Sequence, residues 1–212
     1  MRARRYLNPL LAVMHPILNS PYAYGVLMRA LGSEACLKRL LREHLRIRPG
    51  DRVLDAGCGP GLLYSLLPRV DYLGVDIDAR YLAHARALHP AARFEQCDLT
   101  EDAGCQTRGD MDVMVAIGLL HHLSDLQVLR MLAFAGRRLR AGGRLVTVDP
   151  ALEAGQNPIA HLLAHADRGR HVRSGSDYLD LARTTFPYAT LTVRHDLLHV
   201  PYTHAVLECR RA

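Results

Sequence analysis

The stretch VLDAGCGPG, residues 53–61, joins an aspartate and three closely spaced glycines to the end of a short apolar run. The run RVLDA is typical of a buried strand, and the following GLLYSLL is typical of a helix that ends at Pro68. A single glycine suffices for a tight turn, so Gly57, Gly59 and Gly61 together indicate a ligand that approaches the backbone closely. A glycine turn between a strand and a helix predicts a nucleotide-type site.

The rest of the chain alternates apolar strands with helices. Helices are expected over residues 79–88, with Asp78 as the cap, and over 124–140, before Gly142 and Gly143. Further strands are expected at YLGVDI, RFEQC, MDVMVAI and RLVTVD, and ATLTVRHDL and HAVLECR are expected to form an antiparallel pair at the sheet edge. Strands alternating with crossover helices predict an α/β fold with a mostly parallel sheet and helices on both faces.

Two segments fall outside this alternation. Residues 8–46 have a helical pattern, with Ser33 as the expected N-cap of EACLKRLLREHL, and residues 1–48 are interpreted as an N-terminal helical lid. Residues 150–176 are interpreted as an insertion after the fifth strand that carries a short helix around IAHLLAH, and Ser176 is expected to cap the next helix. The sheet and this insertion form the remaining unit, residues 49–212.

Composition and charge narrow the class of protein. The chain has 212 residues, of which 49% are hydrophobic and 23% charged, as in a soluble globular protein of one domain. The net charge of +6 comes from arginines scattered along the whole chain, which are typical of solvated faces and do not favour nucleic-acid binding. Nothing in the sequence indicates an oligomeric state.

The cysteines and the N-terminus bear on the compartment. Five cysteines without C-x-x-C spacing predict reduced thiols in a cytoplasmic protein, without a zinc knuckle: Cys36, Cys58, Cys97, Cys105 and Cys209. The first residues have a basic head, but Pro9 and Pro16 bracket an apolar run too short to span a bilayer. A signal peptide is therefore not expected, and the alternative is an amphipathic lid or a membrane-surface helix.

The acids at the strand ends identify the ligand of the glycine turn. The dinucleotide fingerprint needs a glycine at position 62, where this chain has Leu62, and Asp55 would repel a pyrophosphate but attract a cationic group. Asp76 follows Asp55 by 21 residues, a spacing suited to binding the two hydroxyls of a ribose. Asp98 could accept from an exocyclic amine, and Leu99 could offer its amide to a purine nitrogen. S-adenosylmethionine combines these groups without a phosphate.

With these motifs the chain resembles the class I S-adenosylmethionine-dependent methyltransferases of the small-molecule type. The matching stretches lie between about residues 50 and 150: VLDAGCGPG, GVDID, CDL, DMDVMVAIGLLHHL and GGRLVTVD. The resemblance implies a seven-stranded, mostly parallel, doubly wound Rossmann-like sheet with a reversed final hairpin. It also implies where the cofactor binds: its methionine part at Gly57, Cys58, Gly59 and Gly61, its ribose at Asp76 and Ile77, its adenine at Asp98 and Leu99, and its sulfonium near Ala116 and Ile117.

Candidate catalytic residues follow the fourth and fifth strands. His121 and His122 in GLLHHLSD face the space beyond the sulfonium, and an imidazole can remove a proton from a hydroxyl acceptor. The alternative is that one of them braces the backbone; the family resemblance favours this role for His122. Asp149, at the end of the fifth strand, could orient a histidine or bind the acceptor, or it could be a turn aspartate before Pro150.

The insertion contains candidate acceptor-binding residues. Arg168, His171 and Arg173 cluster there with Asp167, and bidentate arginines suit carboxylate or phosphate groups. This cluster predicts an acidic acceptor, and the alternative is a solvated loop. Tyr22 and Tyr24 are expected to roof the pocket or to pack under the lid.

A metal site is not expected. His161 and His165 are one helical turn apart, but the zinc-protease pattern requires a glutamate at position 162, which is Leu162 here.

The sequence thus predicts methyl transfer to a small molecule, with oxygen favoured over nitrogen and carbon as the acceptor atom. No N-P-P-Y or D-P-P-Y motif follows the fourth strand, and no Pro-Cys dipeptide offers a thiolate to a cytosine ring. Three alternatives stay open: an RNA methyltransferase, a methyltransferase whose acceptor is a lipid at a membrane surface, and a partner subunit that binds the cofactor without catalysis.

Overall fold

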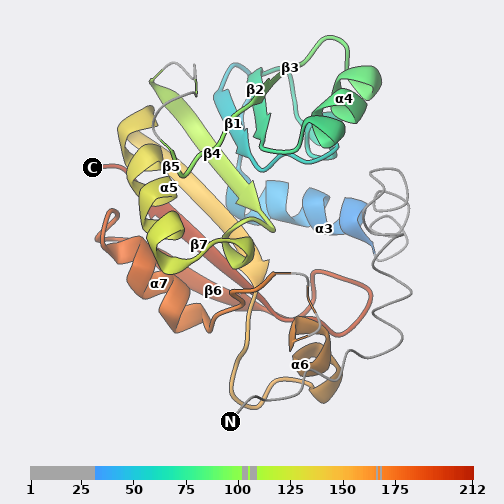
Figure 1. Cartoon of the computed structure of the whole chain (residues 1–212), viewed down its shortest axis with the longest axis vertical. Coiled ribbons are helices and arrows are strands. Elements are labelled where there is room, and N and C mark those ends of the chain that lie inside the picture. The colour runs from blue at the N-terminus through green and yellow to red at the C-terminus, as the bar shows by residue number, and fades with distance from the viewer. Residues whose placement is uncertain (1–31, 102–104, 106–108, 166, 168) are drawn as a thin grey trace.

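A computed structural model describes residues 32–101, 105, 109–165, 167 and 169–212, and its centre is a seven-stranded sheet of order β3-β2-β1-β4-β5-β7-β6 (Figure 1). The strands are β1 Arg52–Ala56, β2 Asp71–Asp76, β3 Arg93–Gln96, β4 Met111–Ile117, β5 Leu139–Pro150, β6 Thr190–Arg194 and β7 His204–Arg210. The pairs among β1 to β5 are parallel, whereas β7 is antiparallel to both β5 and β6. The predicted doubly wound sheet with a reversed final hairpin is confirmed.

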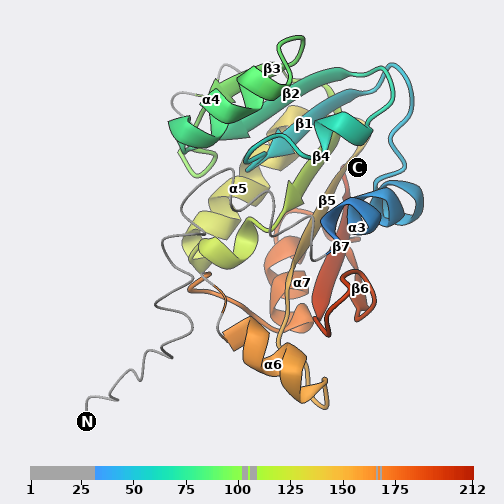
Figure 2. The ribbon, with the colours of Figure 1, turned by 90° about the vertical axis from the view of Figure 1, so that its right-hand side faces the viewer.

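Helices cover both faces of this sheet. They are α3 Ser33–Leu40, which continues as a π-helical turn over Leu41–Leu45, α4 Ala79–Leu88, α5 Asp125–Arg138, α6 Pro158–His165 and α7 Gly175–Arg183. Successive strand residues point to opposite faces, so Val113 packs on the side of α3 and α4, and Met114 packs on the side of α5 and α7. In two views of the molecule α4 lies at one end and α6 at the other (Figures 1 and 2).

The helix caps differ in part from those expected. Asp78 caps α4 as predicted, since its side chain accepts a hydrogen bond from the backbone N–H of Arg80 at 2.8 Å. The prediction for Ser33 was wrong: it lies inside α3, and Gly32 is the N-cap. The prediction for Ser176 was also wrong, because Ser174 accepts from the Asp177 N–H and the Asp177 carboxylate bonds back to Ser174, which is a capping box.

Two element boundaries also differ. The helix expected over GLLYSLL is only a 3₁₀ turn, Tyr64–Leu66, because the glycine turn occupies the residues before it and Pro68 follows. The helix expected over residues 124–140 ends at Arg138, and β5 begins at Leu139 and includes Gly142 and Gly143. A Cβ at Gly143 would lie 2.8 Å from the carbonyl oxygen of Met111, so this glycine allows two backbones to approach closely.

The expectation that all cysteines are reduced was wrong for one pair. Cys97, directly after β3, is joined by a disulfide to Cys105, and the two Cα atoms are 5.3 Å apart. The two cysteines are eight positions apart and do not have C-x-x-C spacing, so the sequence pattern did not indicate that they pair. Cys36, Cys58 and Cys209 are free and buried.

The N-terminal predictions lie mostly outside the described residues. Tyr22, Tyr24 and residues 1–31 of the expected lid belong to this part. The described part packs on the sheet, since Leu37 and Leu40 of α3 share a hydrophobic cluster with Val53 and Val206. Within the described ranges, no helix is both long enough and apolar enough to cross a membrane.

Candidate functional site

The glycine turn lies at the carboxyl end of β1 and bonds to the neighbouring strand. Gly57, Gly59 and Gly61 have φ angles of 71°, 52° and 77°, a left-handed conformation that favours glycine. The N–H groups of Gly57 and Cys58 donate to the carbonyl of Val75 at 2.8 and 3.0 Å. A Cβ at Gly59 would meet no atom within 4 Å, so this part of the turn presents bare backbone to open space.

Asp76, at the end of β2, holds the glycine turn in place. One carboxylate oxygen accepts from the Gly59 N–H at 2.9 Å, and the other accepts from the Asp78 N–H at 2.9 Å. Burial raises the pKa of Asp76. Each oxygen keeps a second lone pair, and the side chain is only half-buried, so the carboxylate can still accept from a pair of hydroxyls.

Asp55 is the most enclosed of the three acids around the glycine turn. Its side chain is 4% exposed and accepts a hydrogen bond from the Tyr72 hydroxyl at 2.8 Å. Burial raises the pKa of Asp55 to about 7. A cationic ligand group nearby would favour the charged carboxylate and offset part of this cost. Tyr72 was missed by the sequence reasoning, since nothing in an apolar strand reveals that its hydroxyl turns to Asp55.

The ends of β2 and β3 combine an apolar surface with an acid. Ile77 is 64% exposed, although it is a large hydrophobic residue, and its carbonyl accepts from the Gln96 amide at 2.9 Å. Asp98 uses one carboxylate oxygen to accept from the N–H and the hydroxyl of Thr100 at 2.8 and 2.7 Å. Leu99 is buried beside it. This arrangement can hold a flat apolar ring with polar edges.

The two residues predicted at the end of β4, Ala116 and Ile117, offer little side-chain surface to a ligand. Ala116 is fully buried, and Ile117 is half-buried and packs with the cluster under α3 and α4. Any contact of Ala116 with a ligand must therefore come from its backbone.

His121 lies in the 3₁₀ turn Leu120–His122 after β4, between two carboxylates. Its Nδ1 is 2.9 Å from Asp149 Oδ1, and its Nε2 is 3.2 Å from Asp167 Oδ1. Burial disfavours the charged ring, but the hydrogen bonds to Asp149 and Asp167 outweigh it and raise the pKa of His121 to about 9. At neutral pH His121 is therefore an imidazolium that donates from both ring nitrogens.

Asp167 connects His121 to the insertion and to the β6–β7 connection. Its carboxylate accepts from the Gly169 N–H at 2.7 Å and from the Tyr202 hydroxyl at 2.9 Å. Burial opposes ionisation, but the bonds from His121 prevail and lower the pKa of Asp167 to about 2. We call His121, Asp149, Asp167 and Tyr202 the clamp. Tyr202 was missed by the sequence reasoning, because it is far from the other three in sequence.

The remaining candidates on the acceptor side have different surroundings. Asp149 is buried, and its Oδ2 has no hydrogen-bond partner among the described residues. The ring of His122 is exposed to solvent and lies 4.0 Å, centroid to centroid, from that of His121. His171 is exposed, and its N–H donates to the His121 carbonyl at 3.0 Å. Arg168 lies outside the described residues.

Arg173 was predicted to bind the acceptor, but in the structure its side chain bonds to other parts of the fold. Its side chain is 9% exposed, and all five guanidinium N–H donors are used within the fold. They bond to the carboxylate of Asp125 and to the carbonyls of Leu120, Leu123 and His171. Arg173 therefore holds the loop after β4 against the insertion.

Metal ligands do not gather in the described residues, where no group of three or more His, Cys, Asp or Glu side chains could hold an ion. His161 and His165 stack at 4.3 Å between ring centroids on the exposed side of α6.

The charge of His121 predicts a loss of stability at alkaline pH. Its pKa is raised from the ordinary 6.5 to about 9, so the folded state holds a proton that the unfolded state releases between these values. The contribution is complete below pH 6.5 and is lost as the pH rises through 9. We expect the contribution of His121 to the free energy of unfolding to fall by about 3 kcal/mol between about pH 6 and pH 9.5.

Urea unfolding at both pH values measures this loss, and Asp167→Asn is the informative comparison. An asparagine cannot favour the imidazolium as a carboxylate does, so the variant should lose clearly less stability than the original chain over the same range. His84→Gln, on α4, should behave like the original chain. Equal losses in the original chain and in Asp167→Asn would contradict the charged state assigned to His121.

Comparisons with known proteins find similarity to methyltransferases. A family model described as a methyltransferase domain matches residues 53–143. Trans-aconitate 2-methyltransferase of Methylobacterium nodulans is 33% identical over 168 residues, covering 65% of this chain and 62% of that protein. An uncharacterized methyltransferase of Synechocystis is 29% identical over 135 residues, covering 61% and 63%. The chain thus spans less than two thirds of the length of these curated relatives.

A solved structure supports the fold over a longer range. The TehB-like SAM-dependent methyltransferase from Corynebacterium glutamicum superposes with a TM-score of 0.62 at 22% sequence identity. The match covers 90% of this chain and 98% of that one. At 22% identity this similarity shows a shared fold and nothing further.

Proposed function

Because the chain belongs to the class I S-adenosylmethionine-dependent methyltransferases, we propose that it transfers a methyl group from this cofactor to an oxygen atom of a small acidic molecule. The observation that carries the proposal is the row of acids Asp55, Asp76 and Asp98 around a glycine turn, at the carboxyl ends of three neighbouring strands. This row offers partners for a cation, a ribose and an adenine.

The residues of the site fit the cofactor, S-adenosylmethionine, which supplies an electrophilic methyl group. The turn Gly57, Cys58, Gly59 and Gly61, whose backbone is open to space at Gly59, would hold its methionine part, with Asp55 near the ammonium. Asp76 would accept from the ribose hydroxyls, and the exposed Ile77 would pack on the adenine. Asp98 and Leu99 would bond the adenine edge, and the backbone at Ala116 and Ile117 would border the sulfonium.

On the acceptor side, we assign different roles to the two histidines. His121 cannot serve as a base in the clamped state, since both of its ring nitrogens donate to carboxylates. We assign proton removal from a hydroxyl acceptor to His122, and we assign to Asp149 the positioning of His121. An acidic acceptor is supported by the name of the Methylobacterium relative, a trans-aconitate methyltransferase.

Calorimetric titration with S-adenosylhomocysteine, followed by turnover of S-adenosylmethionine with a metabolite extract, tests the proposal. We expect binding of the cofactor product and formation of S-adenosylhomocysteine together with a methylated small acid. Binding without turnover would favour a non-catalytic partner subunit. Steeply salt-dependent RNA binding would favour an RNA methyltransferase.

The assignment of the base predicts how His122→Gln behaves. Loss of a general base lowers turnover by about 10²- to 10⁴-fold, while the affinity for S-adenosylhomocysteine should stay unchanged. The acceptor identified in the extract serves as substrate, and His84→Gln is the matched control on α4. Turnover at the original rate in both His122→Gln and His121→Gln would rule out a role for either histidine.

A further inference from the structure

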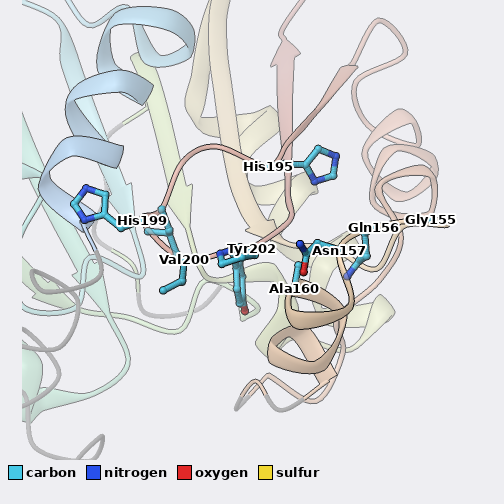
Figure 3. Close-up of a pocket in the computed structure, with 10 residues that line it drawn as sticks. Gly155, Gln156, Asn157, Ala160, His195, His199, Val200 and Tyr202 are labelled. Carbon is cyan, nitrogen blue, oxygen red and sulfur yellow. The ribbon is translucent and has the colours of Figure 1, made fainter.

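A cavity of about 500 Å³ lies between the segment that precedes α6 and the connection between β6 and β7 (Figure 3). Gln156 and Asn157 line it from the first segment, and His195, His199 and Tyr202 line it from the second. Apolar side chains from both segments complete the wall, namely Ala160, Leu198, Val200 and Pro201. The volume suits a metabolite-sized molecule with an apolar body and a few polar groups.

The polar groups of this wall are rich in hydrogen-bond donors. The Gln156 side-chain oxygen accepts from the N–H of Glu153, whereas its Nε2 is buried and has no partner among the described residues. Such an unpaired buried donor is best satisfied by an oxygen of a ligand. The first turn of α6 adds the positive end of a helix dipole, since Asn157 caps this helix and Ala160 lines the cavity.

Two carboxylates close to the cavity are already paired with cationic side chains. Asp196 follows His195 and is paired with Arg39 at 2.6 Å and with Arg194 at 2.8 Å. Asp167 accepts from Tyr202 and is paired with His121. Among the described residues, no Asp, Glu, Lys or Arg lines the cavity itself. The described part of the wall therefore offers no carboxylate to an ammonium group, whereas its unpaired amide donor favours an anion.

The cavity is also joined to the proposed reaction centre. Tyr202 lines the cavity, and its hydroxyl donates to Asp167, which pairs with His121 at the carboxyl end of β4. We propose that this cavity binds the carboxylate of an organic acid, with the Gln156 amide as the main donor and the imidazoles of His195 and His199 as additional donors. The inference rests on the proposed function, because it identifies this acid with the methyl acceptor.

Three probes with one skeleton test the charge preference: 4-hydroxybenzoate, 4-hydroxybenzamide and 4-hydroxybenzylamine. Each is titrated calorimetrically into the protein, with and without S-adenosylhomocysteine. A charged acceptor forms a stronger hydrogen bond than a neutral one, so we expect the carboxylate to bind at least about tenfold more tightly than the amide. The ammonium compound should bind most weakly.

Gln156→Glu tests the location of the site. This variant keeps the oxygen that accepts from Glu153 and replaces the unpaired donor with a charged oxygen. The carboxylate probe should lose at least about tenfold in affinity, and the ammonium probe should gain. Ala83→Glu adds the same charge at an exposed position of α4, at the far end of the molecule (Figure 2), and should leave the order of the probes unchanged. Val200→Trp should block all three probes by filling the cavity.

Equal binding of the carboxylate and the amide would overturn the anion preference, as would the absence of carboxylate binding. An unchanged carboxylate affinity in both Gln156→Glu and Val200→Trp would overturn the location. The titration with S-adenosylhomocysteine alone judges the proposed function separately. If the original chain fails to bind it but binds the carboxylate through Gln156, the proposed function fails and the anion site stands.

Discussion

Replacing Asp76 with alanine is expected to weaken the binding of S-adenosylhomocysteine by about a hundredfold to a thousandfold. The carboxylate would accept hydrogen bonds from two ribose hydroxyls, and hydrogen bonds to a charged group contribute about 1.5–3 kcal/mol each. The variant also removes the bonds to the N–H groups of Gly59 and Asp78, so the glycine turn loses its anchor to β2. Calorimetric titration measures the change in dissociation constant.

Asp78→Asn is the matched control for this substitution. Asp78 stands two residues further along and is paired with Arg80 at 2.6 Å, and an asparagine caps a helix about as well as an aspartate. Asp78→Asn removes one negative charge from the same region. The affinity of this variant for S-adenosylhomocysteine should stay within about twofold of that of the original chain. If Asp76→Ala loses less than about fivefold, Asp76 does not bind the ribose.

The glycine turn and its place in the sheet could be predicted because their signals are local in sequence. VLDAGCGPG contains the strand end, the acid and the turn within nine residues, and the structure places it at the carboxyl end of β1. The alternation of apolar runs and helices predicted the parallel sheet, and the final hairpin followed from two short alternating runs. Boundaries were less accurate where backbone pairing decides them, as at Gly143, which lies inside β5.

The acceptor side could not be predicted to the same depth, because its contacts are made between residues far apart in sequence. Asp149 and Tyr202 are separated by 53 positions, yet both belong to the clamp around His121. A count of charged residues in the insertion suggested that Arg173 binds the acceptor, but its five donors are satisfied within the fold. The structural role of Arg173 becomes visible only when the insertion is seen to pack on the loop after β4.

Gly169→Ala should cause a large loss of turnover on the acceptor side. A Cβ at this position would overlap with the imidazole ring of His121 and lie 2.7 Å from the His121 carbonyl oxygen, so the insertion would have to move away from the clamp. Such a movement would break the bonds of Asp167 to His121 and Tyr202. Two hydrogen bonds that involve charged groups contribute at least about 3 kcal/mol together, so turnover should fall by about a hundredfold or more.

The predicted loss has a pattern that a general defect in folding would not produce. The glycine turn lies at β1 and β2, away from the insertion, so Gly169→Ala should keep its affinity for S-adenosylhomocysteine within about twofold. The clamp would also open in this variant, so the pKa of His121, followed by NMR, should fall from about 9 towards its ordinary value. Gly109→Ala is the matched control, because a Cβ at Gly109 would meet nothing within 4 Å. Full turnover in Gly169→Ala would mean that the clamp does not shape the acceptor site, and an unchanged pKa would mean that the clamp tolerates the added methyl group.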